Sequence, residues 1–452
     1  LTYIFAVYKT FWFYVTILGM KKIALVSHGC AKNLVDSELI LGLLAQNGYK
    51  ITLNEEETDT VIVNTCSFIC DAERESIRTI LELVDAGKKV IVTGCLAQKH
   101  PEELKKEIPE LAGVVGATDF TKIIEVLQKI DGEYVCEVSE KPNYIYPENI
   151  ERQQITMGAS SYIKIADGCN YRCGYCIIPY LRGDYHSRKM EDIIEEAKKL
   201  VKKGVTEIIL IAQDTTGYGV DLYKKPMLAK LLEELNKIEG LGWLRIMYAY
   251  PTQMTDELLD TIAKLDKVVK YVDIPLQHSH PEMLKMMNRP SFDYRPMIEN
   301  IRKRIPNVSI RTAFIVGYPG ETEEHFEHLC DFVSDMKFDR MGVFTYSREK
   351  GTPSYNMPNR VGARVAKQRY KKLMEIQQGI SIERNRSFIG KTIPCIIECY
   401  ADNGEIVARS QYDAPEIDGI VNIKTDKHVV PGDIEPVKII DATEYDLVGK
   451  IV

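Results

Sequence analysis

The sequence predicts an α/β protein of three modules: an N-terminal parallel α/β sheet domain, a central partial (β/α)6 barrel, and a small C-terminal all-β barrel. Strand-like and helix-like runs alternate from residue 22 to about residue 389. The central stretch contains six such strand–helix units, fewer than the eight of a closed barrel. After Gly390 the helical pattern disappears, and a length of 452 residues suits about three domains.

Residues 1–19 are apolar and aromatic, unlike anything that follows them. Lys9 interrupts this run, and the uninterrupted stretch of residues 11–18 is far shorter than the roughly 20 residues of a spanning helix. No small-residue cleavage site follows. We interpret residues 1–19 as a non-native or disordered extension ahead of Met20, with a surface tail and a membrane anchor as the alternatives.

The first module is expected over residues 20–135. Its strand-like runs are KIALVS, DTVIVNT and KKVIVTG, and helix-like segments separate them, namely VDSELILGLLAQNG and residues 71–86. Such alternation predicts a parallel sheet with helices on both faces. The polar, proline-containing stretch of residues 136–154 is expected to be a linker.

The central module is expected over residues 155–389. Its six candidate strands are YIKIAD, EIILIAQD, WLRIMYAYP, VKYVDIPLQ, SIRTAFIVGYP and RMGVFTYS. A long basic helix, from about residue 365 to residue 389, closes the module. In parallel α/β folds the active site lies at the carboxyl ends of the strands, so we expect the chemistry there.

The last module, residues 390–452, shows short alternating strands with turn residues between them, which predicts a small OB-like barrel. It carries twelve acidic and six basic side chains, and so accounts for most of the chain's net charge of −7. Cys395 and Cys399 share strand parity and are expected to face the same side of this barrel.

Three cysteines, Cys169, Cys173 and Cys176, form a C-x3-C-x2-C array directly after the strand YIKIAD. Three thiolates on one loop can hold three irons of a four-iron cluster and leave one iron open to an outside ligand. A zinc knuckle is the alternative, but zinc needs a fourth ligand, and none is evident in the loop. The eleven cysteines are an odd number in a long chain, which favours reduced thiols in a cytoplasm over a disulfide scaffold.

A second set, Cys30, Cys66 and Cys95, is spread over three successive strand–loop units, and each cysteine lies just past the end of a strand. Parallel strands end on the same rim, so these three thiols are expected to converge and to hold a second, auxiliary cluster. Three inert buried cysteines are the alternative. Cys70 follows Cys66 by four residues, and we expect it to face the core from a helix.

The cysteine loop ADGCNYRCGYCIIP resembles the signature of the radical S-adenosylmethionine (SAM) superfamily. From Met20 onward the chain resembles the methylthiotransferases of that superfamily, in the stretches SHGCAKNLVDSE, VDIPLQHSHPEMLKMMNRP, AFIVGYPGETEEHF, YSREKGTPSY and ARSQYDAPEIDG. The resemblance implies the domain order methylthiotransferase, radical SAM and TRAM, with two 4Fe-4S clusters and SAM as cofactors. The open iron of the Cys169, Cys173 and Cys176 cluster would bind SAM for reductive cleavage, and the auxiliary cluster would carry the transferred sulfur.

Further residues are candidates for cofactor or substrate contacts. Gly317 and Glu321, in IVGYPGET with Pro319 and Gly320, are expected to shape a loop that approaches the adenosyl group. Many relatives place a Gly-Gly-Glu run after the second barrel strand, where this chain has IAQD, so Gln213 and Asp214 are candidates there.

Four other side chains have a functional and a structural interpretation. His278 lies at a strand end and would line the substrate pocket or serve the core. Arg182, Arg188 and Arg289 would contact substrate or carboxylates, or lie solvated on the surface.

Two substrates fit a methylthiotransferase: an aspartate β-carbon of the small-subunit ribosomal protein S-twelve, and an adenosine of tRNA. The acidic last module would repel RNA and attract a basic ribosomal protein, so we predict the protein substrate, with tRNA disfavoured. An electron donor such as flavodoxin or ferredoxin would reduce the clusters in a cytoplasmic enzyme. A non-enzymatic iron–sulfur protein is the alternative class, but electron carriers normally saturate every iron with protein ligands.

Overall fold

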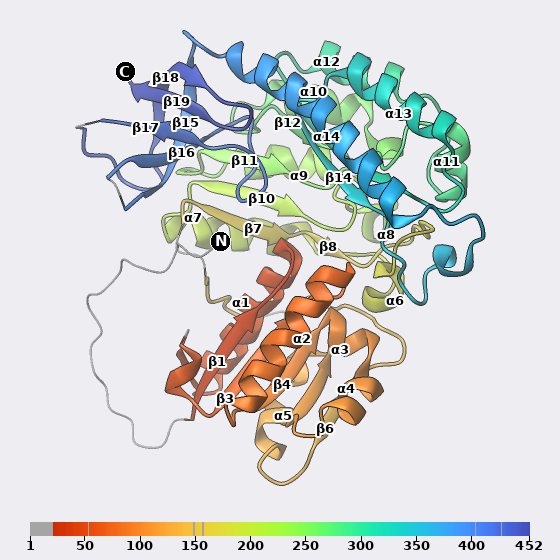
Figure 1. The fold of residues 1–452 in the computed structure, drawn as a ribbon. Helices are drawn as coiled ribbons and strands as arrows, with labels where there is room; N and C mark the ends of the chain where they lie inside the picture. Colours follow the sequence, from red (N-terminus) through yellow and green to blue (C-terminus); the bar gives the residue numbers. More distant parts are fainter. Residues whose placement is uncertain (1–20, 53, 148–149, 156–157, 403, 426) are drawn as a thin grey trace.

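The three modules form one body in the computed structural model (Figure 1). The model describes residues 21–452 except 53, 148–149, 156–157, 403 and 426, so the expected extension at residues 1–19 lies outside the described residues. The central domain lies between the N-terminal domain and the C-terminal barrel, as the colours of Figure 1 show. Within the described part of the chain, no helix is long and apolar enough to cross a membrane.

The N-terminal sheet has six parallel strands in the order β2-β1-β3-β4-β5-β6. Its central strands are rich in valine and isoleucine and fully buried, as expected for a sheet covered on both faces. The elements are β1 Lys22–Ser27, α1 Ala31–Gln46, β2 Lys50–Thr52, η1 Glu55–Glu57, β3 Thr60–Thr65, α2 Cys70–Asp85, β4 Lys89–Gly94, α3 Cys95–Lys99, α4 Pro101–Glu107, β5 Gly113–Gly116, η2 Phe120–Lys122, α5 Ile123–Lys129 and β6 Val135–Glu137. All strands being parallel, their carboxyl ends share one edge.

The central domain confirms the partial barrel, with two parallel sheets, β11-β10-β7 and β12-β13-β14. A parallel bridge between Leu244 and Val268 joins the two sheets, so six strands follow one another around the barrel. The first half contains β7 Ser160–Lys164, β8 Ala166–Asp167, α6 Ile178–Arg182, β9 His186–Ser187, α7 Met190–Lys202, β10 Glu207–Ile211, α8 Val220–Tyr223, α9 Leu228–Leu235, β11 Trp243–Ile246 and η3 Pro251–Gln253. The second half contains α10 Asp256–Lys264, β12 Tyr271–Asp273, α11 Pro281–Met286, α12 Arg295–Arg304, β13 Ser309–Val316, α13 Glu323–Met336, β14 Arg340–Thr345, η4 Pro353–Asn356 and α14 Ala363–Arg386.

Several barrel strands end earlier than the sequence predicts. The run VKYVDIPLQ forms strand only at β12, and WLRIMYAYP only at β11. The apolar residues that continue both runs stay buried in the loops beyond the strands, for example Ile274, Leu276 and Ala249. Apolar runs therefore overstate strand length here, because these loop residues belong to the core of the central domain and are apolar for that reason.

The C-terminal module is a closed five-stranded barrel in the order β15-β16-β17-β19-β18. Its strands are β15 Thr392–Tyr400, β16 Ile406–Ser410, β17 Val421–Ile423, β18 Ile434–Ala442 and β19 Leu447–Ile451. The expectation that Cys395 and Cys399 face the same side was wrong, since Cys395 is buried and Cys399 is exposed. A register shift between Ile397 and Cys399 reverses the alternation of side chains along β15.

Buried ion pairs join this barrel to the central domain. Glu207 of β10 receives hydrogen bonds from Arg245 and Arg409, and all three side chains are fully buried. Arg340 pairs with Asp413, and Arg311 pairs with Asp418 at 3.3 Å. Two of the acidic side chains of the C-terminal module, Asp413 and Asp418, are thus paired with arginines at this interface.

Candidate iron–sulfur centres

The carboxyl edge of the N-terminal sheet brings together Cys30, Cys66 and Cys95, as the strand order predicts. Cys30 precedes α1, Cys66 follows β3, and Cys95 opens α3 directly after β4. Electrostatic coupling links the Cys66 thiol with those of both Cys30 and Cys95, so the three lie close enough to interact. None of the three is in a disulfide; Cys30 is exposed, and the other two are buried.

Gly29 permits this convergence. It has a φ of +98°, and a Cβ atom there would lie 2.8 Å from the Cβ and 3.0 Å from the Sγ of Cys66. Any larger residue would push the loop of Cys30 away from Cys66. Gly29, the glycine of SHGC, is therefore needed because no larger residue fits between the loop of Cys30 and Cys66.

The donor chemistry of this set suits a metal cluster. Burial raises the pKa of the Cys66 thiol to about 12, with Cys95 and Cys30 adding to the shift, and burial also raises the pKa of Cys95. At neutral pH these thiols are protonated unless a cation replaces the protons. Three thiols on one edge, one of them open to solvent, can supply three ligands to an iron cluster with a free position.

The second cysteine set lies on one loop after β8, at the rim of the barrel. The backbone N–H of Cys176 donates to the carbonyl of Cys173 at 3.0 Å, and that of Gly174 donates to the carbonyl of Met287 at 2.8 Å. Tyr171 of the loop stacks on Tyr250, with ring centroids 3.7 Å apart. These contacts brace the loop that carries the three thiols.

Two thiols of the loop also have raised pKa values. Burial raises the pKa of Cys169 to about 11 and that of Cys176 to about 12, and Cys173 adds to both shifts. Arg289 lies with Nη1 4.0 Å from the Cys173 Sγ, so a cation already faces the set. Thiolates at this position would be stabilised by arginine and iron together.

Arg182 connects the two cysteine sites. It ends α6, which follows the loop of Cys176, and its Nη2 lies 3.9 Å from the Cys95 Sγ and 2.7 Å from the Asn33 Oδ1. Its Nη1 donates to Asp36 of α1 at 2.6 Å. The expectation of a solvated surface arginine was therefore wrong, and the one of a contact with carboxylates is confirmed.

Asp36 and Asp167 complete a buried network around Arg182. Lys164 pairs with both carboxylates, the bond to Asp167 being 2.7 Å, and Tyr144 donates to Asp36 at 3.0 Å. Sequence reasoning missed these residues. Their signal was the presence of charged residues among apolar ones, Lys164 and Asp167 in YIKIAD and Asp36 and Glu38 in LVDSELI, because buried charges need partners.

Gln213 and Asp214, at the end of β10, lie on the same rim. The Gln213 amide donates to Asp167 at 2.6 Å, whereas its Oε1 is one of the buried polar atoms without a hydrogen-bond partner in the described part of the chain. Asp214 accepts from the backbone and hydroxyl groups of Thr216, so it shapes its own turn. Gln213 therefore stays a predicted cofactor contact, and it has an acceptor atom to spare.

The loop of Gly317 and Glu321 is internally braced. Glu321 is buried and accepts from the Gly317 N–H, from Arg369 at 2.8 Å and from His278 at 3.3 Å. His278 itself is fully buried, which is a core position rather than a pocket wall. The contact of Gly317 and Glu321 with the adenosyl group stays a prediction.

The remaining candidates fall in different places. Arg188 is buried and pairs with Glu196 at 2.7 Å, away from the cysteines, so it is not a solvated arginine either. Arg289 lies 4.4 Å from the ring centroid of Tyr250 and beside Cys173. Cys70 is exposed in the first turn of α2, 3.3 Å from the Ser347 hydroxyl, so the expectation that it faces the core was wrong.

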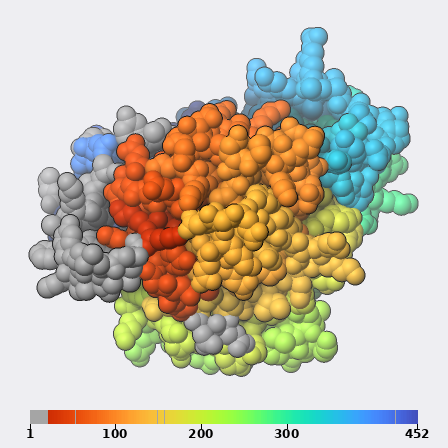
Figure 2. Space-filling model, turned by 90° about the horizontal axis from the view of Figure 1, so that it is seen from below, coloured from red at the N-terminus to blue at the C-terminus, as the bar shows by residue number. Residues whose placement is uncertain are grey.

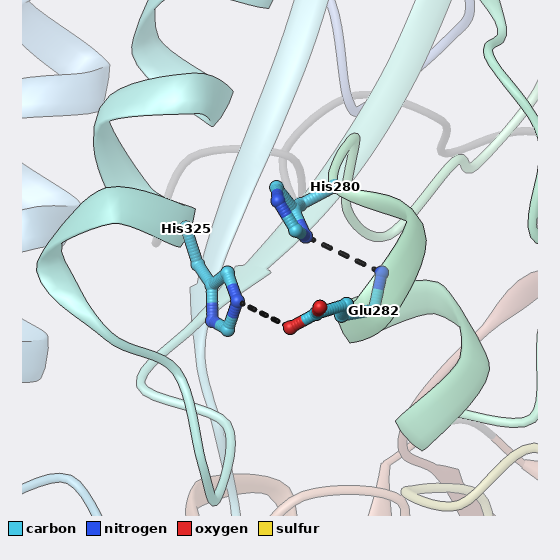
Figure 3. Close-up of side chains that lie close together, drawn as sticks. All are labelled: His280, Glu282 and His325. Carbon is cyan, nitrogen blue, oxygen red and sulfur yellow. Dashed lines mark hydrogen bonds and ion pairs between the residues drawn. The ribbon is translucent and has the colours of Figure 1, made fainter.

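His280, Glu282 and His325 gather near the start of α11 (Figure 3). The His280 Nδ1 accepts from the Glu282 N–H at 3.3 Å, and the His325 Nδ1 accepts from the Thr322 N–H at 3.2 Å. Each neutral ring must then carry its proton on Nε2, which leaves no lone pair there for a metal. The group caps two helices and does not resemble a metal site.

Over the face seen from below, the N-terminal domain covers the middle of the molecule, with the central domain visible at its edges (Figure 2). Cys95 at the edge of the sheet packs against Ile177 and Leu181, which follow the Cys176 loop of the barrel. The α6 helix of the barrel contacts α3 of the sheet domain, and Arg182 spans the join. The set of Cys30, Cys66 and Cys95 thus lies at a domain interface, beside the segment that directly follows the Cys176 loop.

Three regions of the chain match known families. Residues 163–333 match the radical SAM superfamily, residues 22–116 match the uncharacterized protein family UPF0004, and residues 389–452 match the TRAM domain. Among solved structures, the radical SAM methyltransferase TsrM from Kitasatospora setae is similar with a TM-score of 0.56 at 15% identity, covering 75% of this chain and 77% of that one. This likeness shows a shared fold.

Curated relatives match almost the whole chain. The ribosomal protein uS12 methylthiotransferase RimO of Crocosphaera subtropica is 49% identical over 96% of this chain and 100% of its own length. The RimO protein of a Thermoanaerobacter species is 51% identical over 95% of this chain and 100% of its own length. The chain therefore belongs to the RimO family, radical SAM transferases that use 4Fe-4S clusters and S-adenosylmethionine.

Proposed function

We propose that this enzyme adds a methylthio group to the β-carbon of an aspartate in ribosomal protein uS12. The observation that carries the proposal is a pair of three-cysteine sets on the two sides of one domain interface, in a chain that RimO proteins match over 95% or more of its length. When bound, the clusters and SAM supply one-electron chemistry that can break an unactivated C–H bond, together with the sulfur and methyl group that replace the hydrogen.

In this proposal each cysteine set has one task. Cys169, Cys173 and Cys176 hold the cluster that acts on SAM, and Cys30, Cys66 and Cys95 hold the auxiliary cluster that carries the sulfur. Gln213, Gly317 and Glu321 are proposed SAM contacts. The N-terminal domain over the barrel rim would exclude water from a reactive radical. We place the domain limits at 20–135, 155–389 and 390–452, joined by the linker 136–154, although β6 of the N-terminal sheet extends two residues into this linker, to Glu137.

We further propose that the TRAM domain holds the basic ribosomal protein. The acidity of the TRAM domain supports this proposal, although Asp413 and Asp418 form ion pairs with Arg340 and Arg311 of the central domain. The acidic side chains Asp402, Glu416, Asp433, Asp441 and Glu444 stay exposed. A flavodoxin or ferredoxin is the proposed electron donor, and the cytoplasm, where ribosomes are assembled, is the proposed location.

The test uses the reconstituted wild-type holoenzyme, with SAM, sulfide and a strong reductant under anaerobic conditions. We expect uS12 to gain about 46 Da, one methylthio group in place of one hydrogen, and tRNA to remain unmodified. A methylthio-adenosine in tRNA with uS12 unchanged would contradict the proposed substrate. The two cluster sites would then serve a tRNA enzyme.

A further inference from the structure

We propose that Lys32 binds the side-chain carboxylate of the substrate aspartate, and so selects aspartate over its uncharged analogue. This inference rests on the proposed function. It assigns to the chain a binding group for the reacting residue, which neither cysteine set supplies.

Lys32 lies where such a group is needed. It is the second residue of α1, two residues after Cys30, and its side chain crosses from the N-terminal domain to the barrel. The Nζ atom lies 3.5 Å from the carbonyl oxygen of Ala212 and 3.7 Å from the ring centroid of Tyr248. Ala212 and Tyr248 come just after β10 and β11, so Lys32 reaches the carboxyl rim of the barrel.

The charge of Lys32 is not neutralised within the described part of the chain, where no acidic side chain forms an ion pair with it. The neighbouring carboxylates are engaged elsewhere: Asp36 by Lys164 and Arg182, and Asp273 by Arg311 at 3.0 Å. A half-buried ammonium group that has only a distant carbonyl and an aromatic face for contacts favours an incoming anion.

Of the other cations at this rim, two are paired with carboxylates and the third lies beside the other cysteine set. Arg182 and Lys164 have carboxylate partners, and Arg289 donates to the Pro275 carbonyl and packs on Tyr250 at the side of Cys173. Lys32 is therefore the cation beside Cys30 that is left for a ligand. Lys32 lies in the first turn of α1, where the positive end of the helix dipole also favours an anion.

Tyr248 fixes the ammonium group in place. Its φ of +61° is rare for an aromatic residue, and two hydrogen bonds hold it: its N–H donates to Asp273 at 2.9 Å, and its carbonyl accepts from Thr215 at 3.0 Å. Because its ring contacts Lys32, two residues after Cys30, Tyr248 lies near the auxiliary site. The backbone thus holds a strained turn that presents one aromatic face to Lys32.

The chemistry of the substrate explains why a cation belongs at this point. The carboxylate of aspartate is one bond away from the β-carbon that gains the sulfur. An ammonium group two residues from Cys30 would hold that carboxylate on the side from which the sulfur comes. An asparagine at the same position lacks the charge and would leave the ammonium group without its anion.

The test compares kcat/KM for uS12 and for uS12 with asparagine at the modified position, using reconstituted Lys32→Met, Lys32→Arg and wild-type holoenzymes. We expect Lys32→Met to lower kcat/KM for the aspartate substrate by about tenfold or more, mostly through KM, and to leave the poor activity on the asparagine substrate unchanged. Lys32→Arg should keep most of the preference for aspartate.

Lys129→Met removes the same charge from an exposed position of the same domain and should match wild type. Iron content and SAM cleavage without substrate report whether Lys32→Met still holds both clusters, and we expect them to equal wild type. If Lys32→Met retains the full preference for aspartate, or if it loses iron and both activities together, the inference is overturned while the proposed function stands. A wild-type enzyme that leaves uS12 unmodified overturns both.

Discussion

The two cysteine sites reach the same donor set by opposite routes. Cys169, Cys173 and Cys176 occupy eight consecutive residues, and local hydrogen bonds shape their loop. Cys30, Cys66 and Cys95 are spread over 66 residues of sequence and meet only because β1, β3 and β4 are adjacent parallel strands. The first site needs one well-formed loop, whereas the second needs a whole folded domain.

The largest expected effect separates the two sites by function. Cys173→Ala should reduce both SAM cleavage and methylthio transfer to background, because no other set is expected to bind SAM. Cys66→Ala should reduce methylthio transfer to background while SAM is still cleaved to 5′-deoxyadenosine. Chromatography of the nucleoside products and the mass of uS12 measure the two outcomes.

Cys399→Ser, at an exposed position of the C-terminal barrel, is the control and should behave as wild type. If Cys66→Ala also abolished SAM cleavage, the two sites would not be separable. The two cysteine sites would then act as one centre.

The next effect concerns the join between the sites. Arg182→Met would leave Asp36 and Asp167 with Lys164 as their remaining buried cation, which should lower the free energy of unfolding by about 3 kcal/mol. Chemical denaturation of the apoprotein measures this change in the free energy of unfolding. Arg188→Met, which removes a buried arginine away from the cysteines, should destabilise similarly but leave the iron content of Cys30, Cys66 and Cys95 intact. If Arg182→Met and Arg188→Met lost the same amount of iron, Arg182 would have no special role at the site of Cys30, Cys66 and Cys95.

A smaller, pH-dependent effect is expected where the C-terminal barrel docks. Burial raises the pKa of Glu207, but Arg409 and Arg245 outweigh it and hold the pKa at about 2, against 4.5 for an ordinary glutamate. A lowered pKa stabilises the fold above the unfolded value and loses that contribution as the pH falls toward 2. Glu207→Gln should therefore cost about 3 kcal/mol at pH 7, and its difference from wild type should narrow below pH 4.5. A difference independent of pH would mean that the charge contributes nothing.

The smallest effect is expected at the cysteine nearest to the auxiliary set in sequence. Cys70→Ser should keep full iron content and activity, because Cys70 is exposed and contacts Ser347 and Glu349 instead of the other cysteines. Iron analysis of Cys70→Ser, with Cys66→Ser measured in parallel, checks this prediction. Loss of one cluster in Cys70→Ser would extend the ligand set to a fourth residue.

The sequence was sufficient for whatever depends on spacing or strand order. Both cysteine sets, the order of the modules and the six barrel units follow from motif spacing and alternation, and the fold confirms the modules and the barrel. Strand ends were not predictable in the same way, because apolar residues beyond β11 and β12 are buried in the core of the central domain although they lie in loops. A single bulge in β15 was enough to defeat the parity argument for Cys399.

Long-range polar contacts also escaped prediction. Arg182 meets Asp36 across 146 residues, and Lys164 meets it across 128, so no local pattern could pair them. The charge argument was incomplete for the same reason. The acidic residues Asp413 and Asp418 count toward the TRAM domain in sequence, but they face arginines of the central domain in space.

The most direct test of the central claim is the intact mass of uS12, together with the nucleosides of tRNA, from cells with and without the gene. The account predicts that deletion lowers the mass of uS12 by about 46 Da and leaves the methylthio-adenosine of tRNA unchanged. Restoring the gene should restore the mass, and restoring it with Cys66→Ala should not. A uS12 mass that does not change on deletion would contradict the account.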